Sequence, residues 1–192
     1  MNENYKVNVP IGEKGIWRIE KFTVTPEDEK LEMLRSVFSS SSRGRFTPAG
    51  EYTRLMRGGA VVMSDTPDEI NDIRVPIRRA TGNILINGLG LGVLLNAVLM
   101  KSNVCHVTVI ELSGDVIELV GTYYKKLYGN RLEIINADAL KFRSNGSHYN
   151  LVWHDIWDNI CEDNLPQMKT LHRKYGRKCD WQGSWCREYL TR

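Results

Sequence analysis

Three glycines between an apolar strand and an apolar helix are the residues of this chain with the clearest chemical use. They are Gly88, Gly90 and Gly92, in the segment NILINGLGLGVLLNAVLM at residues 83–100. Glycine allows positive φ and a close approach of the backbone to a ligand, and the helix that follows offers free N–H groups. This order predicts a site for an adenosine-like ligand, and a buried turn without a ligand is the alternative.

Three acidic residues close or follow the next strands along the chain. Glu111 closes the segment HVTVIE, Asp138 follows RLEIINA, and Asp155 closes YNLVWHD. The carboxyl ends of parallel strands meet at one edge of a sheet, so we expect these carboxylates to converge on one crevice. For Asp155 the alternative is the N-cap of a following helix. His154 alternates with Asp155 and is expected on the opposite face, as a core histidine.

The spacing of these residues separates one class of ligand from another. Glu111 follows Gly88 at roughly the 20-residue spacing of a carboxylate that accepts hydrogen bonds from a ribose diol. A dinucleotide fingerprint requires glycine at position 93, where the chain has Val93. A triphosphate loop requires lysine and then serine or threonine after the glycines, and the chain lacks that pair. The pattern therefore favours an adenosine ligand, with a dinucleotide enzyme as the less favoured alternative.

The apolar segments supply the elements that position these residues. From residue 83 onward, short runs rich in β-formers alternate with segments of helical periodicity. We predict strands at 83–87, 106–111, 131–137, 149–155 and near 178–184, and helices after the glycines, at 114–124 and at about 162–174. This order predicts an α/β fold: a Rossmann-like, doubly wound and mainly parallel sheet, shortened at the C-terminus.

The first part of the chain has a different pattern. We expect a small N-terminal β/α extension at residues 1–60 and the Rossmann-like domain at residues 61–192. Within the extension, a strand is predicted at 15–24, and Thr25 is expected to cap a helix that begins at Pro26. Residues 51–64 predict an antiparallel ribbon. The short side of the parallel sheet is expected to be covered by the N-terminal residues or by a second subunit, which would make a homodimer.

Composition and charge limit the classes of protein to which the chain can belong. The chain has 192 residues, 42% of them hydrophobic, and a formal net charge of +3. It is long enough for one large domain with a buried core, and its small net charge gives no support for nucleic acid as a partner. The sequence shows no signal-like or membrane-spanning segment, so we expect a cytoplasmic protein without a membrane partner. Four cysteines without CxxC spacing predict reduced thiols and no metal site.

The series INGLGLG, VIE, NADA and VWHDIWD resembles the class I S-adenosylmethionine-dependent methyltransferases in order and spacing, over about residues 61–185. Within that superfamily, MSDTPDEI, NADAL, WHD and WQGSW are similar to the spermidine synthase branch. The resemblance implies methyl transfer to a small-molecule acceptor, with an amine as one candidate. The implied cofactor is S-adenosylmethionine or its decarboxylated form. Aminopropyl transfer and a non-catalytic module that binds the cofactor remain as alternatives.

The resemblance also implies roles for the residues that match its motifs. Asp155 would take the proton from an attacking amine, Glu111 would bind the ribose hydroxyls, and Asp138 would accept from the adenine amino group. The full set of implied cofactor-binding residues is Asn87, Gly88, Gly90, Gly92, Glu111, Asp138 and Ala139. Leu91 stands where spermidine synthases carry an aspartate that holds the amine end of their donor, which favours methyl over aminopropyl transfer.

Aromatic and polar residues outside these motifs are candidates for a substrate pocket. We assign Asp65, Trp157 and Gln182 to that pocket. Trp181 and Trp185 would share a face if their segment were helical. Aromatic rings can hold a protonated or methylated amine, although coverage of a short core is the alternative use.

Overall fold

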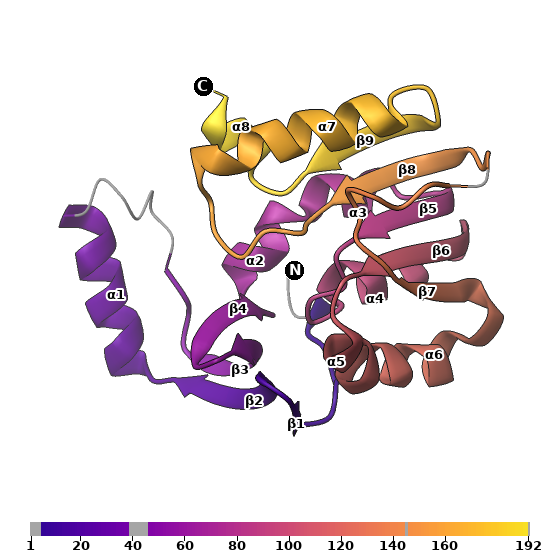
Figure 1. The fold of residues 1–192 in the computed structure, drawn as a ribbon. Helices are drawn as coiled ribbons and strands as arrows, with labels where there is room; N and C mark the ends of the chain where they lie inside the picture. The colour runs from indigo at the N-terminus through magenta and orange to yellow at the C-terminus, as the bar shows by residue number, and fades with distance from the viewer. Residues whose placement is uncertain (1–4, 39–45, 145, 192) are drawn as a thin grey trace.

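The computed structural model describes residues 5–38, 46–144 and 146–191. The serine-rich segment 39–45, for which the sequence predicts a loop, lies outside the described residues. Two sheets form the framework of the protein (Figure 1). One is antiparallel with strand order β1-β2-β3-β4, and the other is parallel with strand order β7-β6-β5-β8-β9. The second sheet confirms the predicted Rossmann-like α/β fold.

The antiparallel sheet comes from the N-terminal part of the chain. Its strands are β1 (Gly12–Lys14), β2 (Trp17–Val24), β3 (Gly50–Arg57) and β4 (Ala60–Ser64). Helix α1 (Pro26–Phe38) follows β2 and stands beside this sheet, away from the parallel one (Figure 1). Thr25 caps α1 as predicted, because its Oγ1 accepts from the Asp28 N–H at 3.2 Å while the Asp28 carboxylate accepts from the Thr25 N–H at 3.0 Å. The sheet runs to Ser64, past the expected boundary at residue 60.

The parallel sheet follows, and helices connect its strands except between β7 and β8, which are joined by a loop. Two short helices, α2 (Pro67–Asp72) and α3 (Arg74–Arg79), lead from the first sheet into the second. The remaining elements are β5 (Gly82–Asn87), α4 (Val93–Leu99), β6 (Val104–Glu111), α5 (Gly114–Val116), a π-helical turn (Ile117–Gly121), α6 (Thr122–Tyr128), a 3-10 turn (Gly129–Arg131), β7 (Leu132–Asn136), β8 (Tyr149–His154), a second 3-10 turn (Glu162–Asn164), α7 (Leu165–Tyr175), β9 (Cys179–Ser184) and α8 (Arg187–Leu190). Each predicted strand from residue 83 onward is present, and β9 ends the sheet on the side where the sequence predicts shortening.

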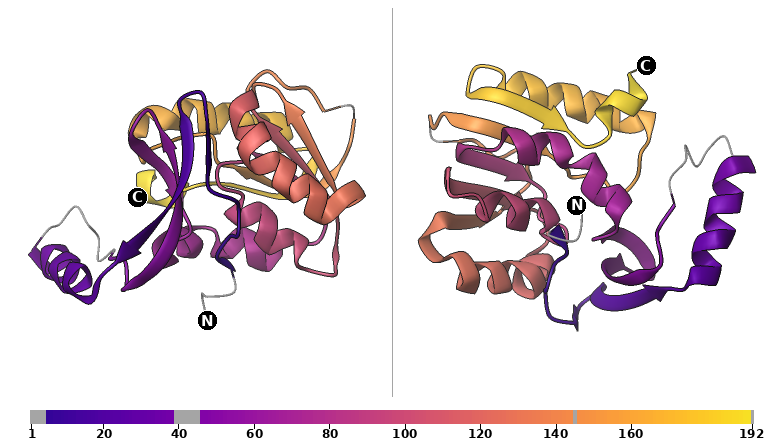
Figure 2. Two further views of the ribbon diagram at one scale, coloured as in Figure 1. Left: turned by 90° about the horizontal axis from the view of Figure 1, so that it is seen from below. Right: turned by 180° about the vertical axis from the view of Figure 1, so that it is seen from behind.

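The two faces of the parallel sheet are covered by different helices, as can be followed in Figure 2. Ile84 and Ile86 of β5 pack in one apolar cluster with α3, α4 and α6, whereas Leu85 packs in a second cluster with Leu171 and Tyr175 of α7. This period-2 alternation buries the side chains of β5 from Ile84 to Asn87, and each buried aliphatic side chain contributes about 1.5 to 3 kcal/mol. No helix in the described part of the chain is long and apolar enough to cross a membrane.

The helix predicted at 114–124 extends to Tyr128 and includes one π-helical turn. The extension has a tertiary cause, because the Tyr128 hydroxyl donates to the Asn96 Oδ1 of α4 at 2.7 Å. Local periodicity does not report such a contact between two helices.

Asp65 binds the N-terminal arm (residues 5–11) and β3 rather than lining the cavity described below, which corrects the sequence assignment. It is 1% exposed, and its carboxylate accepts from the Thr53 N–H at 2.7 Å and from the Val7 N–H at 3.1 Å. A buried carboxylate is tolerated when backbone N–H groups satisfy it. Asp65 therefore holds the N-terminal arm and β3 against the segment that enters α2.

Asp65→Ala is expected to lower the free energy of unfolding by about 2 to 4 kcal/mol, because two buried N–H groups lose a charged acceptor. Urea denaturation of the variant and of Glu13→Ala, an exposed acid in β1, measures the effect and its control. Equal stability of the two variants would contradict this role of Asp65.

Candidate functional site

A cavity of about 350 Å³ lies between the antiparallel sheet and the carboxyl ends of the parallel strands. Its lining includes the glycine turn and the residues that follow β6, β7 and β8. The antiparallel sheet contributes Trp17, Leu55, Arg57 and Met63. The volume lies in the range of small-molecule sites. Both parts of the chain are therefore needed to enclose it.

The chain leaves β5 through a turn whose backbone conformation favours glycine at positions 88, 90 and 92. Gly88, Gly90 and Gly92 have φ angles of 98°, 51° and 78°. A Cβ on Gly88 would lie 1.8 Å from the Asp155 carbonyl oxygen, and one on Gly92 would lie 2.2 Å from the Tyr124 ring. Gly88 and Gly90 line the cavity, whereas Gly92 starts α4 outside the lining. The three glycines thus serve two purposes: backbone exposure at the cavity and close packing behind it.

Glu111 holds the glycine turn to the loop that follows β6. Its Oε2 accepts from the Leu89 N–H and its Oε1 from the Ser113 N–H, both at 2.8 Å. Each carboxylate oxygen keeps a second lone pair, so the group retains acceptor capacity toward the cavity that it lines. That capacity is what a ribose diol requires.

An apolar slot lies beside Glu111. Ala139, 5% exposed, and Leu112, 72% exposed, both line the cavity, with Ile110 and Leu140 next to them. Asp138 stands at the same end, where its Oδ1 accepts from the Leu140 N–H at 2.8 Å. Small and flat apolar walls with a nearby acceptor suit a planar ring that carries an amino group.

Asp155 directly follows β8 and lines the cavity. Burial raises the pKa of this carboxyl to about 7, the neighbouring Glu69 carboxylate adds to the effect, and the Trp153 indole opposes part of it. A carboxyl group with this pKa can accept or release a proton near neutral pH. The N-cap alternative for Asp155 is wrong, because the next helical turn begins only at Glu162.

The side chains of two predicted site residues, Asn87 and Gln182, point away from the cavity, to the face of the parallel sheet on which His154 lies. The Asn87 amide is 2.8 Å from His154 Nδ1, and Gln182 Oε1 is 3.2 Å from His154 Nε2. Neither side chain lines the cavity. His154 is fully buried between them, and burial lowers its pKa to about 3, which confirms the predicted core histidine. Both assignments are corrected because the side-chain alternation of β5, β8 and β9 turns these groups away.

The tryptophans divide between the cavity and the core. Trp157 lines the cavity, and its indole N–H donates to Gln167 Oε1 at 2.7 Å. Trp185 also lines the cavity. Trp181 instead belongs to β9 and stacks on Trp153 with ring centroids 6.3 Å apart, so the helical alternative for this segment is wrong.

Sequence reasoning missed the lining residues that come from the antiparallel sheet and α2. Met63 reaches the glycine turn, where the Leu91 N–H donates to its Sδ at 3.2 Å. Glu69 of α2 lines the cavity, and its Oε1 accepts from the Ser64 N–H at 2.9 Å. Arg57 and Leu55 are two residues apart in β3, so their side chains lie on the same face, and the alternation in the sequence could have shown this. No local sequence pattern indicates that the antiparallel sheet packs against the glycine turn.

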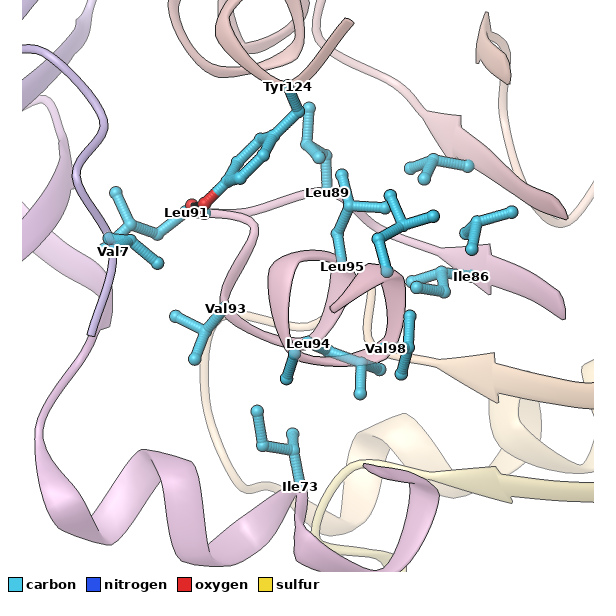
Figure 3. Close-up of a cluster of buried hydrophobic side chains, with 14 of the residues drawn as sticks. Val7, Ile73, Ile86, Leu89, Leu91, Val93, Leu94, Leu95, Val98 and Tyr124 are labelled. Atoms are coloured by element: carbon cyan, nitrogen blue, oxygen red, sulfur yellow. Dashed lines mark hydrogen bonds between the residues drawn. The ribbon is translucent and has the colours of Figure 1, made fainter. Parts of the chain in front are cut away.

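Leu91 lies in the core, although it belongs to the glycine motif. Figure 3 shows its side chain beside Val7, and the Tyr124 hydroxyl points toward Leu91, whose carbonyl oxygen accepts from it at 3.3 Å. It is 0% exposed and does not line the cavity. The position at which the resembling synthases carry an aspartate is therefore a packing position in this chain.

No protein-family model matches the chain, and a search of the curated proteins finds no match. Solved structures with a partial likeness include a putative caffeoyl-CoA O-methyltransferase from Staphylococcus aureus, 23% identical over 59% of this chain and 53% of that chain, with a TM-score of 0.46. A putative RNA methyltransferase from Pyrococcus horikoshii is 14% identical over 60% and 54%, also with a TM-score of 0.46. An S-adenosylmethionine-dependent methyltransferase from Clostridium acetobutylicum is 16% identical over 59% and 44%, with a TM-score of 0.42. The chain thus spans about half the length of these structures, and its fold assignment rests on the strand order and pairing.

Asp155→Asn is expected to stabilise the protein by about 2 kcal/mol at pH 8, allowing for solvent screening of a partly exposed carboxyl. The folded-state pKa of about 7 lies above the ordinary value of 3.8, so the folded parent holds an extra proton between these values. Its stability therefore falls as pH rises through this window, whereas the amide does not titrate. Urea denaturation from pH 4 to pH 8 should show the gap opening above pH 4 and becoming complete above pH 7. A difference independent of pH would contradict it.

Proposed function

We propose that the protein binds S-adenosylmethionine and transfers its methyl group to a small acceptor that carries an amine. The observation that carries the proposal is the convergence of the glycine turn, Glu111, Asp138 and Asp155 on one cavity. These groups come from four strand ends, and their order matches the motifs of the resemblance. The proposal goes beyond the fold, which by itself does not specify an activity.

The lining residues fit each part of the proposed cofactor. Glu111 has acceptor capacity for the ribose hydroxyls. Asp138 and the apolar slot at Ala139 suit the adenine amino group and ring. The turn at Gly88 and Gly90 exposes backbone where the methionine part would lie.

The charge of the cavity favours cationic ligands. Carboxylates of Glu69, Glu111, Asp138, Asp155 and Asp158 line it, and Arg57 is the single lysine or arginine among the described lining residues. A field of this sign attracts a sulfonium group and a protonated amine and disfavours anionic acceptors. The aromatic rings at the same cavity can add cation–π attraction.

Asp155 is the residue proposed to handle the proton of the acceptor. S-adenosylmethionine, when bound, supplies a methyl group on a sulfonium sulfur that leaves readily. An amine must lose a proton to attack, and a carboxylate with a pKa near 7 can take that proton at neutral pH. The antiparallel sheet covers this end of the cavity, where it limits water and fixes the relative positions of the reactants.

Aminopropyl transfer from decarboxylated S-adenosylmethionine is less well supported. Leu91 packs in the core, so the described chain offers no acid at the position where the resembling synthases carry one. A non-catalytic module would bind the cofactor without turnover, and the experiments below separate these cases.

Glu111→Ala is expected to weaken binding of S-adenosylhomocysteine by about 1.5 to 3 kcal/mol, because it removes the acceptor of the ribose hydroxyls. For the parent protein, titration calorimetry also measures the affinities for S-adenosylmethionine, its decarboxylated form, methylthioadenosine and NAD. Glu118→Ala serves as the control, since Glu118 pairs with Lys14 on the surface. Binding of NAD alone would overturn the proposal.

Asp155→Asn is expected to lower kcat/KM by about 100-fold with small primary amines or polyamines, because the proton acceptor is lost. For the parent, kcat/KM should rise with pH up to about 7 and then level off, as Asp155 ionises. The control is Asp180→Asn, an exposed acid on β9. Unchanged turnover in Asp155→Asn would remove this residue from catalysis, and tight binding without turnover in the parent would favour the binding module.

A further inference from the structure

Arg57 lines the cavity from β3, the strand next to β4, whose Met63 contacts the glycine turn. It is the last residue of β3 and pairs across the sheet with Trp17, and its guanidinium lies 5.5 Å from the centroid of the Trp17 ring. Its Nη2 forms an ion pair with the carboxylate of Asp158, which belongs to the loop after β8. Both side chains remain partly exposed, at 45% and 38%.

The antiparallel sheet brings Arg57 to the cavity beside the strand that contacts the glycine turn, where the methionine part is proposed to lie. Leu55 pairs with Met63 across β3 and β4, and Met63 contacts the glycine turn through the Leu91 N–H. Arg57 is two residues beyond Leu55 and shares its face, and both side chains line the cavity. The adenine slot at Ala139 belongs to a different strand end, after β7.

The acidic lining of the cavity raises the question of which group would bind the negatively charged carboxylate of the proposed cofactor. S-adenosylmethionine carries an α-carboxylate, whereas its decarboxylated form and methylthioadenosine do not. A carboxylate that enters a cavity lined by five acids needs a cationic partner or several N–H donors. Arg57 is the single cationic side chain in the described lining, and a guanidinium presents two parallel N–H groups to a carboxylate.

We propose that Arg57 binds the α-carboxylate of S-adenosylmethionine and thereby selects this donor over its decarboxylated form. The inference rests on the proposed function. The guanidinium has five N–H donors, so it can turn toward the ligand and keep or release Asp158. Release costs little, because partly exposed ion pairs contribute at most about 1 kcal/mol. Arg57 is thus a specificity-determining residue contributed by the antiparallel sheet.

The test compares ligands with and without the carboxylate on parent and variant proteins by titration calorimetry. The parent should bind S-adenosylmethionine at least about 10-fold more tightly than decarboxylated S-adenosylmethionine. Arg57→Gln should weaken binding of S-adenosylmethionine and S-adenosylhomocysteine by about 10- to 100-fold. Methylthioadenosine has no carboxylate, and its affinity should change by less than about twofold.

Two further variants keep the test decisive. Arg57→Lys retains the charge but not the two parallel N–H groups, and it should lose less affinity for the carboxylate ligands than Arg57→Gln. Arg54→Gln is the matched control, since Arg54 lies on the same strand but pairs with Glu20 outside the cavity lining. Its affinities should equal those of the parent.

The possible failures are distinguishable. Unchanged affinity of Arg57→Gln for S-adenosylmethionine, or a parent that prefers the decarboxylated donor, would overturn the role of Arg57 alone. An equal loss of methylthioadenosine binding would also overturn it, because the effect would then be structural. A parent that binds none of these nucleosides would overturn the proposed function and this inference together.

Discussion

The close approach of Gly88 to the backbone of Asp155 is the constraint on which the rest of the site depends. Strands β5 and β8 pair up to Asn87 and His154, and the Asp155 N–H then donates to the Asn87 carbonyl at 2.8 Å. A side chain at position 88 would overlap the Asp155 carbonyl oxygen. The chain therefore leaves β5 through positive φ, which exposes the turn to the cavity and keeps the backbone of Asp155 next to it.

The antiparallel sheet is a structural part of the site. Parallel strand ends supply the glycine turn and the acids, but the opposite wall of the cavity consists of residues from β2, β3 and β4. Buried Asp65 fixes this wall through backbone N–H groups of the N-terminal arm and β3. Met63 of this wall lies beside Asp155 and Glu69, so the wall contributes to the dielectric environment of Asp155.

Local sequence patterns predicted the strands, the glycine turn and the strand-end position of Glu111, Asp138 and Asp155, because these depend on period, turn chemistry and the geometry of parallel sheets. They could not predict which way Asn87 and Gln182 point, since that follows from the pairing of β5, β8 and β9. The contributions of the antiparallel sheet depend on how two sheets dock, and apolar alternation is the same whether such a face covers a core or a ligand.

The arrangement combines an acidic cavity with one arginine, an apolar slot and a carboxyl group that titrates near neutral pH. The most direct test of its central claim is a crystal structure of the protein with S-adenosylhomocysteine. We expect the adenine against Ala139 and Leu112, the ribose at Glu111, and the amino-acid part between the glycine turn and the antiparallel sheet. A ligand bound elsewhere, or a cavity that stays without ligand at saturating concentration, would contradict it.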